Sequence, residues 1–348
     1  MSETDPVIVD LLGNQDIRDH LLTLSRRNEL HHCLLFEGPP GLGKAASARW
    51  LAQAINCMEE DEGARPCGRC WSCRSIHTDQ HPDVLQIGLD PQRAAPIISV
   101  RQAREVISKL ALRPYRARRR LIIIDPADAM KAEAANALLK TFEEPPQDTG
   151  FILVCASARR LLTTVRSRSQ RIRFRPIALP ALETWLAEQG VAEPHWLARL
   201  SDGCPGRALA LADGQAQEWR AQRDALLEAL NAPIEARFKY TEQMTSTRGG
   251  GGRSAWVTRV EVMLDALQRL VRDSLAMQHG TPPERLYNAD RLELVAAWAD
   301  QLQLAGCERI GQAIDKSRQE MAAYVNGRLM LDALLSVVVA ELGAESGR

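Results

Sequence analysis

Four cysteines within a short stretch form the clearest candidate metal site in the sequence. Nine residues separate the first from the second, and two residues separate each later pair: Cys57, Cys67, Cys70 and Cys73. Four thiolates suit a tetrahedral Zn²⁺ ion, and four protein ligands leave no position for a catalytic water. The spacing therefore predicts a structural zinc knuckle that offers a rigid contact surface. The alternative is four reduced cysteines without a metal.

A glycine-rich segment has the pattern of a phosphate-binding loop. Gly38, Gly41 and Gly43 precede Lys44, between an apolar run and a helical pattern. Glycines allow backbone N–H groups to close around phosphate oxygens, and the lysine of such a loop reaches the outer phosphates of a nucleotide. The segment therefore predicts an ATP-type phosphate loop.

The residues that would supply catalysis at this loop are missing. An active loop continues with Ser or Thr, whose hydroxyl binds Mg²⁺, but the next residue is Ala45. Asp125 ends a later apolar run, where an active enzyme of this type carries Glu to polarise water; here Pro126 follows. The residues leave three possibilities open: a retained structural turn, which we favour, passive nucleotide binding, or hydrolysis.

Seven arginines lie between Arg159 and Arg175. A guanidinium group carries a fork of donors that matches phosphate oxygens, and it stays protonated. An arginine that reaches a nucleotide on a neighbouring subunit can strongly accelerate phosphoryl transfer. The segment is therefore either a solvated basic face or the source of such an arginine.

Short apolar runs in the first half of the chain predict buried strands that position these residues. The runs are residues 34–36, 84–87, 121–124 and 151–155, and the alternation over 171–174 favours a further short strand. Helices are predicted after Ser99, which has capping-box spacing to Gln102, and over 128–144. Strands that alternate with helices predict a mainly parallel α/β sheet.

Beyond Pro176 the pattern is helical, with a glycine-rich loop predicted over 245–254. We expect an α/β domain over 1–175, a small helical domain over 176–213 and a helical domain over 214–348. The 348 residues are 45% hydrophobic and 25% charged with zero formal net charge, which is typical of a globular protein whose nucleic-acid contacts must be local. The acidic start and the absence of a long apolar run predict a cytoplasmic protein without a signal peptide or membrane span.

The order of these motifs closely resembles that of bacterial DNA polymerase III clamp-loader subunits, the γ/τ and δ′ proteins. The resemblance covers residues 1–213, and the later third matches only in being helical. It is carried by the phosphate loop, the cysteine spacing, His81-Pro82-Asp83, ANALLKTFEEPP at 135–146 and Ser167-Arg168-Ser169. It implies an AAA+ domain with a zinc module, a helical lid and a helical collar that closes a hetero-pentamer with γ/τ and δ subunits.

Departures from the γ/τ pattern resemble the δ′ type. The family's Lys-Thr and Asp-Glu pairs are broken at Ala45 and Pro126, and the lid arginine is replaced by Gly206, with Arg207 one residue late. Arg168 matches the finger that reaches the ATP site of an adjacent γ subunit. The resemblance implies a non-hydrolytic stator, no enzyme by itself, in a polymerase holoenzyme that loads the sliding clamp at a primer–template junction.

Contact with DNA phosphates is expected from helix N-termini and basic side chains. The candidates are Ser99, Arg101 and Arg104. Two other functions remain open: a γ/τ-like ATPase motor with unusual ligands, and a zinc-dependent nucleic-acid adaptor outside replication. Ala45 and Pro126 weigh against the first, and the neutral net charge weighs against the second.

Overall fold

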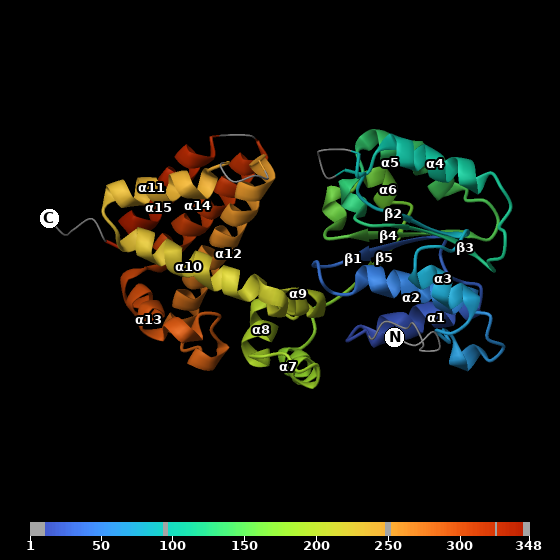
Figure 1. Ribbon diagram of the computed structural model, residues 1–348, viewed down its shortest axis with the longest axis horizontal. Helices are drawn as coiled ribbons and strands as arrows, with labels where there is room; N and C mark the ends of the chain where they lie inside the picture. The colour runs from blue at the N-terminus through green and yellow to red at the C-terminus, as the bar shows by residue number, and fades with distance from the viewer. Residues whose placement is uncertain (1–10, 93–96, 248–251, 324–325, 344–348) are drawn as a thin grey trace. The chain divides into compact units, whose positions relative to one another are not determined.

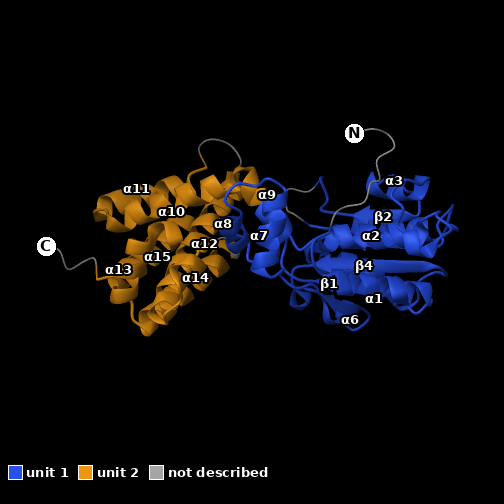
Figure 2. Cartoon of the chain, turned by 90° about the horizontal axis from the view of Figure 1, so that it is seen from below, with its two compact units in different colours: residues 1–209 blue, residues 210–348 orange. Residues whose placement is uncertain are grey.

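The computed structural model describes residues 11–92, 97–247, 252–323 and 326–343. The chain divides into two compact units, residues 1–209 and 210–348, which Figure 2 distinguishes by colour. Among the described residues, no helix combines the length and apolarity needed to cross a bilayer.

A parallel sheet forms the centre of the first unit. Its strand order is β2-β3-β4-β1-β5, and every ladder is parallel. Leu35 of β1 lies beside Leu153 of β4 and Arg171 of β5. The four apolar runs and the predicted short strand are all confirmed as strands. Their bounds are β1 (Cys33–Glu37), β2 (Val84–Ile87), β3 (Arg120–Ile124), β4 (Thr149–Cys155) and β5 (Gln170–Arg173).

Helices cover both faces of this sheet (Figure 1), so successive apolar strand residues are buried on opposite sides. Leu35 and Ile122 pack on one side, whereas Leu34 and Ile123 pack on the other. The predicted mainly parallel α/β class is therefore confirmed. The helices are α4 (Val100–Leu110) and α5 (Ala132–Glu143) on the first side, and α1 (Gln15–Arg26), α2 (Lys44–Asn56) and α3 (Trp71–His77) on the second.

Helix α4 begins as predicted, because the Gln102 side chain accepts a 2.9 Å hydrogen bond from the Ser99 backbone N–H. Helix α5 begins later than the predicted residue 128. A short 3-10 turn occupies Ala127–Ala129, and Met130 and Lys131 have extended backbones, with ψ of 123° and 159°. The α-helix can therefore start only at Ala132.

Three short helices end the first unit, and the second unit is helical in its described residues. Around the long helix α12, apolar side chains of α10, α14 and α15 form one core. Residues 248–251 of the predicted loop lie outside the described residues, and residues 252–254 are helical rather than loop. The helices are α6 (Thr163–Arg166), α7 (Leu179–Glu188), α8 (Pro194–Leu200), α9 (Pro205–Ala210), α10 (Ala216–Asn231), α11 (Ile234–Thr245), α12 (Gly252–Gln278), α13 (Leu292–Gln301), α14 (Leu304–Ala322) and α15 (Gly327–Glu341).

Candidate nucleotide-binding and metal sites

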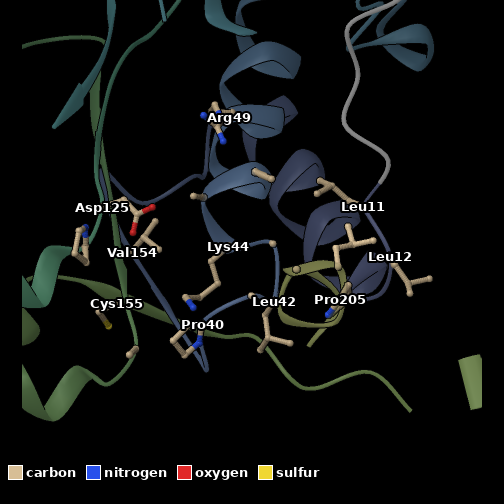
Figure 3. Close-up of a pocket in the computed structure, with 18 of the residues that line it drawn as sticks. Leu11, Leu12, Pro40, Leu42, Lys44, Arg49, Asp125, Val154, Cys155 and Pro205 are labelled. Atoms are coloured by element: carbon tan, nitrogen blue, oxygen red, sulfur yellow. The ribbon is translucent and has the colours of Figure 1, made fainter. Parts of the chain in front are cut away.

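The predicted phosphate loop connects β1 to α2 and borders a cavity of about 530 Å³. Lys44 and Asp125 approach this cavity from the first turn of α2 and from the end of β3 (Figure 3). The Lys44 ammonium is buried and donates hydrogen bonds to the carbonyl oxygens of Gly38, at 2.6 Å, and Pro39, at 2.7 Å. Burial lowers the pKa of Lys44. Carbonyl oxygens of the loop thus accept hydrogen bonds from the lysine that is predicted to reach phosphate.

Two residues on the side of this cavity where Mg²⁺ would bind are apolar. Ala45 and Pro126 both line it, so apolar groups stand where a hydroxyl and a second carboxylate would be needed. Asp125 also lines the cavity, and burial raises the pKa of its carboxyl although Lys44 opposes this shift. Asp128 lines the cavity as well, but it lies three residues beyond Asp125 and not at the adjacent position, which Pro126 occupies.

Helix α9 rests directly on the phosphate loop. The backbone N–H of Gly206 donates a 2.8 Å hydrogen bond to the carbonyl oxygen of Gly41. Gly41 has a φ of +84°, and a Cβ built there would lie 2.7 Å from the backbone nitrogen of Arg207. The Arg207 guanidinium pairs with Asp202 at 3.2 Å. Two glycines thus allow backbone-to-backbone contact at the position where the family's lid arginine is expected.

Replacing Gly41 with Ala is expected to destabilise the chain by about 2–3 kcal/mol, since the left-handed backbone and the close contact with α9 both oppose a Cβ. Gly43→Ala is the matched control. Gly43 has a φ of +73°, but its Cβ would meet only Leu11, at 3.5 Å. Urea unfolding should show a smaller loss of unfolding free energy for Gly43→Ala than for Gly41→Ala. Equal losses would mean that the contact with α9 contributes nothing to stability.

The four clustered cysteines converge as their spacing predicts. Their Sγ atoms all lie within 4.8 Å of one another, and those of Cys57 and Cys70 are 4.0 Å apart. Tetrahedral Zn–S bonds of about 2.3 Å require S···S distances of about 3.8 Å. Backbone N–H groups of Cys67, Cys70 and Cys73 each approach the preceding sulfur at 3.4 Å. The cluster can therefore hold a metal ion.

All eight cysteines are free thiols. The four outside the cluster are small residues buried within or beside the hydrophobic cores. They are Cys33, Cys155, Cys204 and Cys307.

Arg168 follows the short helix α6 on the surface of the first unit, with 33% of its side chain exposed. Its Nε and Nη2 atoms contact one carboxylate oxygen of Glu143, and Nη1 donates to the Thr164 carbonyl oxygen at 3.0 Å. Glu143 lies in the EEPP motif, but its contact with Arg168 joins residues 25 positions apart and could not be predicted from spacing.

Other arginines of the same segment have structural partners. Arg171 donates to the buried carboxylate of Glu37, which also accepts a 2.8 Å bond from the backbone N–H of Ala158. The bond from Arg171 is the main cause of the lowered pKa of Glu37. Arg173 lies 4.0 Å from the same carboxylate. Part of the arginine-rich segment therefore stabilises the end of β1.

The three candidate DNA contacts lie at the start of α4, and they differ in accessibility. Ser99 is buried, and its hydroxyl donates to Asp90 at 2.7 Å. Arg101 and Arg104 are both exposed, and Arg101 pairs with Asp90 at 3.1 Å and with Glu105 at 2.8 Å. Contact with DNA stays a prediction for all three, and the buried Ser99 is the least accessible of them.

Comparison with known proteins gives a consistent set of relatives. Residues 13–178 match the family described as "DNA polymerase III, delta subunit". DNA polymerase III subunit delta′ of Bacillus subtilis is 32% identical over 299 residues, covering 82% of both chains, and that of Escherichia coli is 30% identical over 310 residues, covering 88% of both. A gamma subunit-related protein from Thermotoga maritima superimposes with a TM-score of 0.47 and 17% identity over 92% of this chain and 99% of its own.

Proposed function

Since the chain belongs to the δ′ family of DNA polymerase III clamp-loader subunits, we propose that it is the non-hydrolytic stator of the complex. In this role it supplies Arg168 to the ATP site of a neighbouring γ/τ subunit while its own phosphate loop hydrolyses nothing. The partners are the γ/τ and δ subunits, and the complex acts on the sliding clamp and primer–template DNA.

One observation carries the non-hydrolytic part of the proposal. Ala45 and Pro126 line the cavity at the two positions from which Mg²⁺ binding and water activation must come. The contact between Gly206 and Gly41 supports the same conclusion, because backbone atoms of α9 occupy the place of a nucleotide-sensing side chain. A lid whose backbone is hydrogen-bonded to the phosphate loop suits a stator better than a motor.

The remaining assignments follow from the family. The four clustered cysteines hold a structural Zn²⁺ ion, which keeps the insertion between α2 and α3 rigid. Residues 176–213 act as the lid, and residues 214–348 form the collar that joins the neighbouring subunits. Arg101 and Arg104 contribute to phosphate contacts with DNA inside the assembled ring, at the N-terminal turn of α4.

The isolated chain is expected to release no phosphate from Mg-ATP above the buffer rate, because neither Mg²⁺ ligation nor water activation is available. The measurement is phosphate release by the purified chain, followed by co-purification with γ/τ and δ. Hydrolysis that Lys44→Ala abolishes would favour the ATPase motor instead. Stable DNA binding by the chain alone, dependent on Cys67 and Cys70, would favour the zinc-dependent adaptor.

A further inference from the structure

We propose that Glu143 is the positioning residue for the Arg168 finger, an inference that rests on the proposed function. Arginine must present its guanidinium in one orientation to stabilise charge on a transferring phosphoryl group. An exposed arginine side chain samples many rotamers, and ordering it during catalysis costs conformational entropy. A fixed carboxylate beside it lowers that cost in advance.

The contacts of Arg168 restrain its guanidinium along two edges. One carboxylate oxygen of Glu143 contacts both Nε and Nη2 of Arg168. The carbonyl oxygen of Thr164 accepts a 3.0 Å hydrogen bond from Nη1 of Arg168. These partners come from different elements, the last turn of α5 and helix α6. Rotation about the terminal bonds of the side chain would break one contact or the other, so the plane of the guanidinium is fixed.

The place of Glu143 in α5 is unfavourable for the helix itself. It is the last helical residue, and a carboxylate at a helix C-terminus meets the negative end of the helix dipole. Pro145 and Pro146 follow and prevent the helix from continuing. A negative charge at this position gains stability chiefly through its pairing with Arg168.

The next residue offers a natural comparison. Glu144 is also exposed and carries the same charge, but no ion pair joins it to any residue that the structure describes. With 45% of its side chain exposed, Glu143 remains accessible at the surface where a neighbouring subunit must approach Arg168. The pair is therefore available for function without being a buried structural bridge.

The test uses the complex reconstituted with γ/τ and δ. Glu143→Gln is expected to lower kcat at the ATP site served by Arg168 about 1.5- to 5-fold, the range for loss of one exposed ion pair, with little change in KM. Glu144→Gln removes the same charge one residue away and should leave kcat unchanged. Glu143→Asp, which keeps a carboxylate, should recover part of the loss.

Testing Glu143→Gln together with Arg168→Ala distinguishes failure of the positioning role from failure of the finger assignment. Glu143→Gln should have no further effect in the Arg168→Ala background if it acts only through Arg168. An undiminished effect in that background, an unchanged kcat in the single variant, or a faster kcat would each overturn the positioning role while leaving the finger intact. If Arg168→Ala itself changed nothing, both the finger and its positioning by Glu143 would be wrong.

Discussion

ATP turnover at the site served by Arg168 is expected to fall by about 10³-fold when this residue is replaced with Ala. An arginine supplied in trans contributes about 10³- to 10⁵-fold to phosphoryl transfer, because it neutralises charge that develops on the transferring group. Binding of ATP should change far less than turnover. Pre-steady-state phosphate release by the reconstituted complex measures the effect at this site apart from the other ATP sites.

Arg166→Ala is the matched control for this experiment. Arg166 is the last residue of α6, and its Nη2 bonds only weakly to Thr163, at 3.4 Å. The control removes one positive charge from the same surface without touching the proposed finger. Equal losses from the two variants would mean that general basic charge, and not a finger, supports hydrolysis.

Loss of the zinc module is the second large effect that the structure predicts. Cys70→Ser should reduce bound zinc from one ion per chain to nearly none, since three thiolates form an incomplete tetrahedron. Structural zinc sites in small modules contribute about 10–16 kcal/mol of apparent binding free energy, so the segment between α2 and α3 should lose its order. Zinc content by mass spectrometry and proteolysis of this segment measure the outcome.

The control for the zinc prediction is Cys307→Ala, which removes a buried thiol from the second unit and should retain the metal. Acidification should release the ion as well, because protons compete with zinc for the thiolates. A wild-type chain that purifies without zinc, or a Cys70→Ser variant that keeps it, would show that the cluster is four reduced cysteines.

Strands and motifs near each other in the sequence could be predicted, whereas contacts between distant segments could not. The apolar runs located the strands because both faces of the sheet are buried, and the cysteine spacing located the cysteine cluster because its loop is short. The start of α5 was wrong, because apolar spacing does not reveal that Met130 and Lys131 are extended.

The partners of charged residues were missed for the same reason. Glu143 and Arg168 meet because α5 and α6 pack side by side, and Glu37 meets Arg171 because β1 pairs with β5. The hydrogen bond from Gly206 to Gly41 likewise depends on how α9 packs against the phosphate loop. The residue types of the site could be predicted from sequence spacing. The interactions between those residues become visible only in the fold.

Steady-state ATP hydrolysis by the reconstituted complex, compared between Lys44→Met and Arg168→Ala, tests the stator role most directly. We expect Lys44→Met to retain the turnover of the unchanged complex, since Ala45 and Pro126 leave its own loop without Mg²⁺ ligation and water activation. We expect Arg168→Ala to lose the turnover of the site it serves. A complex that depends on Lys44 and tolerates the loss of Arg168 would contradict the account.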